Sequence, residues 1–350
     1  MAKEKDLSIE TLRGAAIILV VAGFIVRHDI TPEAYPSLAG TLLRLADAAL
    51  SYIRLPLFTV ISSYLYAVSV ARRQTLAKLY KGKTRRILVP FLTFSTLQFL
   101  LFSFLPGSGD HLNEFFSIYL WPRHQLWFLF SVFNIFLIVG FLDACHAMET
   151  PARWKAVLAV SMVLHVLFEM THAFSLWGVN YLMPFFLLGY GLRRFPQEFF
   201  SKPRIYWLMA IAAVSFSLKP VLYAVFDVTL EPLYYKSLGL VVASSVVPLL
   251  FYFRRPVPAL AYLGYYAFGI HLFHRVTAAG MRLWLEPLGI HNALAVFFVY
   301  LAGAIFLALV MQFVFEKTQI TRTLILGMKK PSARIVPDYP NLPSEKHVHV

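Results

Sequence analysis

Long runs of apolar residues recur along the chain and are separated by short polar or basic segments. A membrane-spanning helix needs roughly 20 mostly apolar residues, because its backbone polar groups must be satisfied within the segment itself. Runs such as LWFLFSVFNIFLIVGFL are apolar on all sides and lack the alternation of strands. The pattern predicts an all-α, polytopic bundle of about ten transmembrane helices, over residues 9–27, 50–71, 87–105, 126–143, 155–171, 177–192, 205–225, 235–253, 258–279 and 292–315.

The composition agrees with this prediction. The 350 residues are 59% hydrophobic and 14% charged, whereas soluble domains carry about 25% charged residues. These values exclude a soluble domain and a disordered chain, and the single Cys excludes a disulfide-rich secreted module. The apolar run that follows the charged residues 1–5 is too long for a cleavable signal peptide, so we expect the first helix to remain in the protein.

The net charge of +14 comes mainly from Lys and Arg in alternate loops. A cytoplasmic N-terminus puts 23 Lys and Arg side chains on the cytoplasmic side and 8 on the other, with Arg13 at the inner end of the first helix. Cytoplasmic loops of membrane proteins carry this excess, so both termini are predicted to be cytoplasmic and no nucleic-acid partner is expected. We predict a single transmembrane domain over residues 1–330 and a flexible, cytoplasmic, Pro-rich tail over residues 331–350.

Ionisable side chains inside a bilayer are expensive and often functional. His28 follows Phe24 by four residues, so the two side chains share one face of the first helix. His271 and His274 also share a helix face, but no further metal ligands are evident and no metal site is predicted. These two histidines line a cavity or simply pack between helices. Trp127 is suited to stacking on a sugar or an adenine, or to an interfacial aromatic belt.

Several segments resemble the membrane acyltransferase-3 family. That family opens with an Arg, ten mostly apolar residues and a His, and LRGAAIILVVAG (12–23) is similar to this opening. Further segments resemble later family motifs, in order: RLPLFTVISSYLYA (54–67), KGKTRRILVPF (81–91), LWFL (126–129) and GYYAFGIHLFHRV (264–276). The resemblance extends over residues 8–317.

The resemblance implies an inner-membrane O-acyltransferase that moves an acyl group, often acetyl, from acyl-CoA to a hydroxyl of an envelope polysaccharide or glycolipid. Acyl-CoA would be a co-substrate, and no bound cofactor is expected. Arg13, Lys83, Arg85 and Arg86 are expected to bind the acyl-CoA phosphates, because Arg holds phosphate oxygens in a bidentate fork. The same basic cluster also suits a purely topological role at the cytoplasmic surface.

Phe24 occupies the position of the family's first-helix His, which the resemblance implies is the general base, and a benzyl side chain cannot accept a proton. Three alternatives follow. His28 takes over the role; or the chain is altered here or is a non-catalytic relative, such as an exporter of a glycan or lipid-linked intermediate; or another histidine, His271 or His274, acts. We therefore name His28 and His274 as candidate catalytic residues, and Phe24, Trp127 and His271 as candidate substrate-lining residues.

Overall fold

The computed structural model describes residues 6–70, 75–103, 114–226, 232–285, 287 and 289–329. These residues form helices and turns, with no strand among them, which confirms the predicted all-α class. The predicted tail over residues 331–350 lies outside the described residues. The helices are α1 (Leu7–Asp29), α2 (Leu38–Val70), α3 (Leu76–Lys83), the π-helix η1 (Thr84–Leu88), α4 (Val89–Ser103), α5 (Ser117–Leu120), α6 (Leu126–Ala144), α7 (Pro151–Leu167), η3 (Ala173–Ser175), α8 (Leu176–Arg194), η4 (Pro196–Glu198), α9 (Lys202–Phe226), α10 (Pro232–Tyr252), α11 (Pro258–Leu285), α12 (Ala293–Glu316) and α13 (Gln319–Leu324).

Each of the ten predicted apolar segments forms most of one long helix. Among the described residues, six helical stretches are long and apolar enough to cross a membrane: Leu7–Asp29, Leu38–Val68, Leu76–Ser103, Leu126–Ala144, Leu233–Tyr252 and Ala293–Glu316. The remaining predicted spans correspond to α7, α8, α9 and α11, of which α7 has only 17 residues. α8 and α11 bury much of their surface against other helices, and His271 and His274 of α11 are among the buried residues. For these four helices, membrane spanning stays a prediction.

Two helices extend beyond the apolar segments. α2 begins at Leu38, twelve residues before the predicted start, and includes polar positions such as Arg44 and Asp47. α3, η1 and α4 form one continuous helical stretch through residues that the charge pattern predicts as a basic loop. In both cases the added turns carry charged side chains, which a search for apolar runs does not detect.

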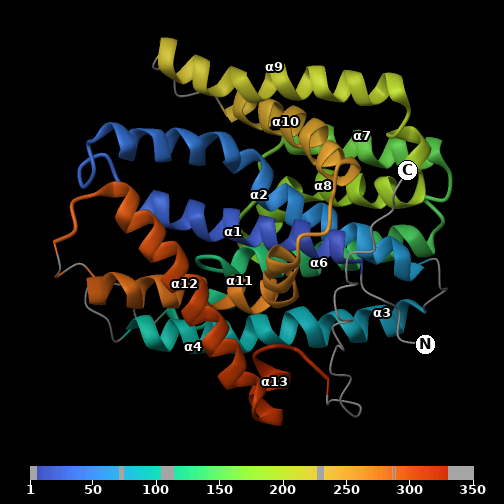
Figure 1. The fold of residues 1–350 in the computed structure, drawn as a ribbon. Helices are drawn as coiled ribbons and strands as arrows, with labels where there is room; N and C mark the ends of the chain where they lie inside the picture. Colours follow the sequence, from blue (N-terminus) through green and yellow to red (C-terminus); the bar gives the residue numbers. More distant parts are fainter. Residues whose placement is uncertain are drawn as a thin grey trace, which may run out of the picture.

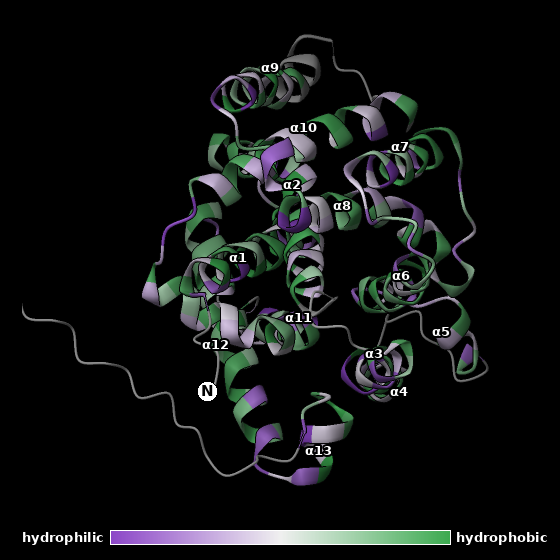
Figure 2. Ribbon diagram, turned by 90° about the vertical axis from the view of Figure 1, so that its right-hand side faces the viewer, coloured by the Kyte–Doolittle hydropathy of each residue, from purple (hydrophilic) through white to green (hydrophobic). Residues whose placement is uncertain are grey.

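Helix α1 lies at the centre of the bundle. Figure 1 shows it running between α2 and α11, and the end-on view of Figure 2 shows the same neighbours around it together with α12. Ile17, Val21 and Ile25 have no exposed surface. α11 crosses α1 closely, because Gly14 and Gly264 each face the backbone of the other helix and a Cβ at either position would overlap it. Small residues at such crossings let two membrane helices approach closely.

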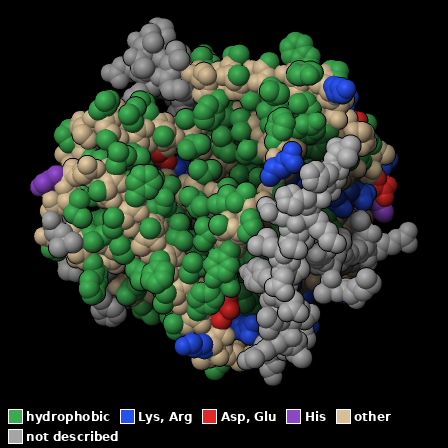
Figure 3. Space-filling model, viewed as in Figure 1, with side chains coloured by type: hydrophobic (Ala, Val, Ile, Leu, Met, Phe, Trp, Pro, Cys, Tyr) green, Lys and Arg blue, Asp and Glu red, His purple; other side chains and the backbone are tan. Residues whose placement is uncertain are grey.

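The outer surface carries many apolar side chains. Figure 3 shows hydrophobic side chains spread widely over one face, with Lys and Arg mostly toward its right-hand and lower edges. The exposed apolar residues include Trp207 and Val214 of α9 and Phe298 and Phe306 of α12. A continuous apolar surface of this kind is suited to contact with lipid and not with water.

Candidate functional site

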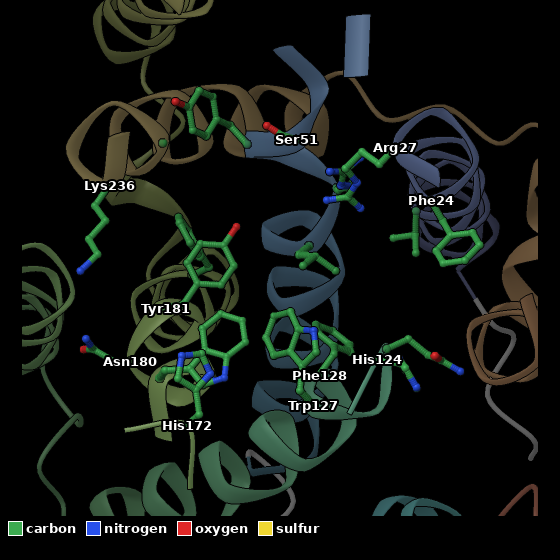
Figure 4. A pocket seen from close by; sticks show the side chains of 18 of the residues that line it. Phe24, Arg27, Ser51, His124, Trp127, Phe128, His172, Asn180, Tyr181 and Lys236 are labelled. Carbon is green, nitrogen blue, oxygen red and sulfur yellow. The ribbon is translucent and has the colours of Figure 1, made fainter. Parts of the chain in front are cut away.

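A cavity of about 690 Å³ lies among α1, α2, α6, α8, α10 and α11 (Figure 4). Its wall includes all five residues that the sequence places at the reacting and substrate-lining positions: Phe24, His28, Trp127, His271 and His274. The four predicted acyl-CoA ligands are not part of this wall. The structure thus divides the predicted residues into one group around the cavity and a second, basic group elsewhere.

Phe24 lies between two imidazole rings. The His28 ring stacks on Phe24 with ring centroids 4.2 Å apart, as expected for residues four apart on one helix. The His274 ring, from α11, meets the same benzyl ring edge-on at 5.4 Å. The guanidinium carbon of Arg275 lies 5.7 Å from the Phe24 centroid. Position 24 is therefore the place where α1 and α11 bring two histidines together.

The hydrogen bonds of these histidines define their tautomers. Nδ1 of His28 lies 2.9 Å from the Phe24 carbonyl oxygen, and Nδ1 of His274 lies 2.7 Å from the His271 carbonyl oxygen. A carbonyl oxygen only accepts hydrogen bonds, so each Nδ1 must carry the proton as donor. In the neutral ring, Nε2 then keeps its lone pair and is able to accept a proton.

Buried polar atoms of the cavity wall include Nε2 of His271 and Oε1 of Gln125, which have no hydrogen-bond partner among the described residues. His271 is 5% exposed, and its ring centroid lies 5.2 Å from that of Phe128. The Gln125 amide nitrogen donates to the side-chain oxygen of Gln98 and to the Leu272 carbonyl oxygen. Leaving such atoms unsatisfied is costly, so they are suited to binding a polar ligand. The sequence-based prediction did not include Gln125. The feature that could have indicated it is its position as a polar residue directly before the LWFL segment.

A cationic group from α1 and α2 also borders the cavity. Arg54 forms an ion pair with Asp47, and both side chains are at least nine-tenths buried. Arg27 donates from Nε to the Gly23 carbonyl oxygen (2.9 Å), and this Nε lies 4.0 Å from Asp47. Gly23 makes room for this group, because a Cβ there would overlap the Arg54 guanidinium. The sequence showed these arginines only as charges on the outer side, since their pairing depends on how α2 packs against α1.

On the opposite wall, Lys236 of α10 pairs with Glu169, with Nζ 3.3 Å from the carboxylate oxygen. His165 and Glu169 are four residues apart but do not share a helix face, because α7 ends at Leu167 and Phe168 has extended backbone angles. His165 packs instead against the Tyr181 ring, at 5.6 Å.

Aromatic rings line one end of the cavity. The rings of Trp127 and Trp177 are 4.3 Å apart, and His172 lies 5.1 Å from Trp177. Figure 4 shows Trp127 and His172 at this end, away from Arg27 and Lys236. Trp127 lines the cavity and packs beside Gly178, where a Cβ would overlap the indole ring. The flat faces of such a group suit the apolar face of a ring-shaped ligand.

The predicted acyl-CoA ligands lie on separate elements. Arg13 of α1 forms an ion pair with Glu10, at 2.9 Å. The ammonium group of Lys83 lies over the Phe136 ring, 3.3 Å from its centroid. Lys83 therefore makes a cation–π contact with α6, which the sequence did not indicate.

Arg85 and Arg86 lie in the π-helix η1, and Arg86 is exposed. The Nε atoms of Arg85 and of Arg322 in α13 are buried without hydrogen-bond partners in the described part of the chain. Gly327 has a φ of +63° and packs against the backbone of Arg85 and Arg86. The residues after α13 thus cover the basic turn, and π-helical turns are frequent at functional sites.

A family model described as an acyltransferase domain, Acyl_transf_3, matches residues 6–313. The comparisons with curated proteins and with solved structures gave no match. The family match covers most of the chain and includes both α1 and α11, which carry the histidines around Phe24. The chain therefore belongs to the acyltransferase-3 family of membrane proteins.

Proposed function

We propose that the protein is an inner-membrane O-acyltransferase that moves an acyl group, acetyl in the first instance, from acyl-CoA to a hydroxyl of an envelope glycan or glycolipid. Family membership supports acyl transfer. The observation that carries the proposal for this chain is the pair of imidazoles around Phe24. Each has an Nε2 able to accept a proton, which replaces the function of the histidine missing at position 24.

In the proposed reaction His28 is the general base. Its Nε2 takes the proton of the acceptor hydroxyl while the hydroxyl oxygen attacks the thioester carbonyl carbon. The C–S bond then breaks, CoA leaves as the thiol with that proton, and the acyl ester remains on the acceptor. No acyl-enzyme is required, and holding both substrates in one cavity supplies part of the rate. His274 is the second candidate base, and His271 and Trp127 line the substrate.

The donor is proposed to bind from the cytoplasmic side, where both chain termini lie in this topology. Arg85 and Arg86 bind phosphates of acyl-CoA, because one has a buried donor without a partner and the other is exposed. Arg13 and Lys83 add positive charge to the same side. Arg86→Gln is expected to raise the KM for acetyl-CoA with little change in kcat.

Phe24 itself favours a second candidate function. Without a histidine at this position, the same cavity would serve a non-catalytic relative that exports a glycan or a lipid-linked intermediate. The two functions differ in their need for an acyl donor. Export fills vesicles with glycan in the absence of acyl-CoA, whereas acyl transfer consumes the donor.

The test uses the purified full chain, radiolabelled acetyl-CoA and an envelope glycan acceptor. His28→Ala is expected to lower product formation by about 100-fold or more, since general bases contribute about 10²–10⁴ to the rate. His274→Ala is expected to retain most activity. His146→Ala is the matched control, because His146 is exposed and lies outside the cavity wall.

Four results contradict this assignment. Full activity in His28→Ala excludes His28 as the base, and loss in His274→Ala alone transfers the role to His274. Activity that arises only in Phe24→His shows that the chain as it stands is inactive. Donor-independent glycan accumulation in vesicles favours the export function.

A further inference from the structure

The cavity wall carries an excess of positive charge. Four cationic side chains line it: Arg27, Arg54, Lys236 and Arg275. Among the described residues, Glu169 is the one carboxylate in this wall, and Asp47 lies directly behind Arg54. Together, the wall and the carboxylate partners of Arg54 and Lys236 hold four cations and two carboxylates. Neither the site predicted from the sequence nor the proposed acyl transfer assigns a role to these charged side chains.

Unbalanced charge in a membrane protein is expensive and calls for a compensating partner. Arg54 and Lys236 have carboxylate partners. Arg27 forms its hydrogen bond to Gly23 and its 4.0 Å ion pair with Asp47 through Nε, and its terminal nitrogens donate to no described residue. Its side chain is 54% exposed, so this planar pair of N–H donors is open to a ligand in the cavity.

The cationic and aromatic residues occupy different parts of the cavity. Figure 4 shows Arg27 and Lys236 on opposite sides of the space, with Tyr181 between them and Trp127 and His172 at the other end. An aromatic face binds the apolar face of a sugar ring, and a guanidinium binds a carboxylate or phosphate. The volume of about 690 Å³ is within the usual range for ligand cavities.

We infer that the acceptor is an anionic oligosaccharide, with a carboxylate or phosphate of one sugar residue held by Arg27 and another of its sugar rings on the Trp127–Trp177 group. This inference rests on the proposed acyl transfer and adds the charge of the acceptor. The anion binds beside Gly23, one residue before Phe24, so the rest of the sugar lies near His28. Arg27 is a specificity-determining residue and takes no part in proton transfer.

The experiment compares three probes on the full-length purified protein: a neutral hexose trisaccharide, the trisaccharide of the corresponding uronic acid, and the neutral trisaccharide with one phosphate monoester. Dissociation constants and acetyl transfer are measured for each. We expect at least one anionic trisaccharide to bind about 10- to 100-fold more tightly than the neutral one, in the range of a charge-assisted hydrogen bond. The two anionic probes separate a carboxylate from a phosphate ligand.

Substitutions test whether Arg27 causes the preference for the anionic probe. Arg27→Gln is expected to remove most of the preference for the anionic probe and to leave binding of the neutral probe unchanged. Arg27→Lys keeps the charge but loses the bidentate fork. Its preference for the anionic probe is therefore expected to lie between that of the unsubstituted protein and that of Arg27→Gln. Glu169→Gln removes the lining carboxylate and is expected to tighten anion binding by about two- to fivefold. Arg123→Gln is the matched control, because it removes an Arg paired with Glu114 outside the cavity wall.

Equal binding of the three probes, binding of none, or an anionic preference that Arg27→Gln leaves intact overturns the inference. Binding and transfer of radiolabelled acetyl-CoA separate this failure from failure of the proposed function. Acetyl transfer to the neutral trisaccharide with equal efficiency contradicts only the anionic acceptor. Loss of acetyl-CoA binding and of transfer to every probe contradicts the acyltransferase proposal itself.

Discussion

His271 combines almost complete burial with an Nε2 atom that has no hydrogen-bond partner among the described residues. A protein gains no stability from such an atom, because burial removes its water and nothing replaces it. Gln125 shows the same pattern at Oε1. Two atoms of this kind on one cavity wall are consistent with a site kept polar for a substrate at the expense of stability.

His271→Leu is therefore expected to leave the thermal unfolding temperature unchanged or higher, because it removes a penalty of about 1–3 kcal/mol. Acetyl transfer is expected to fall about tenfold, since the substrate loses one polar partner. Thermal unfolding in detergent and transfer kinetics measure the two effects. A lower unfolding temperature with unchanged transfer assigns His271 to helix packing instead.

At this scale the sequence predicted local neighbours better than distant ones. His28 stacks on Phe24 because both lie on α1 four residues apart, and helix periodicity alone predicts that. The contact of His274 with the same ring depends on how α11 crosses α1. Likewise, the partners of Arg54 and Lys236 come from packing between helices, so the sequence revealed their charges but not their pairing.

Helices α1 and α11 form the framework of the site. Their crossing at Gly14 and Gly264 is so close that neither position has space for a side chain. The crossing fixes the angle between the two helices. Further along both of them, this angle brings His274 of α11 into contact with Phe24 of α1. The two glycines are therefore expected to matter for both stability and activity, although neither touches the cavity wall.

Gly264→Ala places a methyl group against the Glu10 backbone and is expected to lower the free energy of unfolding by about 1–3 kcal/mol. Gly280→Ala is a matched control on the same helix, because nothing lies within 4 Å of a Cβ there. Thermal unfolding of both variants in detergent checks the difference. Equal unfolding temperatures would show that the two helices separate easily at this point.

Apolar runs predicted the ten long helices because each run exceeds the length of a core strand. They did not predict the first three turns of α2, which carry Arg44 and Asp47. These polar side chains are satisfied inside the fold, since Arg44 donates to the carbonyls of Ile30 and Tyr35 and Asp47 pairs with Arg54. A search for hydrophobicity alone misses a helix whose charges are paired with its own neighbours.

For the whole molecule, the distribution of Lys and Arg predicts an orientation in the membrane. Successive helices run back and forth between two ends of the bundle, with the α1–α2 and α11–α12 turns together at the left in Figure 1. The proposed topology places these turns outside and the α6–α7 turn in the cytoplasm. Cys145 is exposed in that α6–α7 turn and is the one cysteine of the chain.

A membrane-impermeant maleimide is therefore expected to label Cys145 in inside-out vesicles and not in intact spheroplasts. The converse variant combines Cys145→Ser with His291→Cys, in the exposed turn before α12. It is expected to label from the outside only. Labelling of both positions from one side contradicts the arrangement of helices proposed for α7 to α11.

Helix α1 also sets the distance between the level of Arg13 and that of Phe24. Arg13 and Phe24 are eleven residues apart, a rise of about 16 Å along a straight helix. A donor whose charged end stays at the level of Arg13 therefore needs a slender arm of at least that reach to present its carbonyl to His28. The carbonyl of a thioester with a shorter arm would not reach the two imidazoles. The length of this buried helix therefore sets a minimum length for the donor.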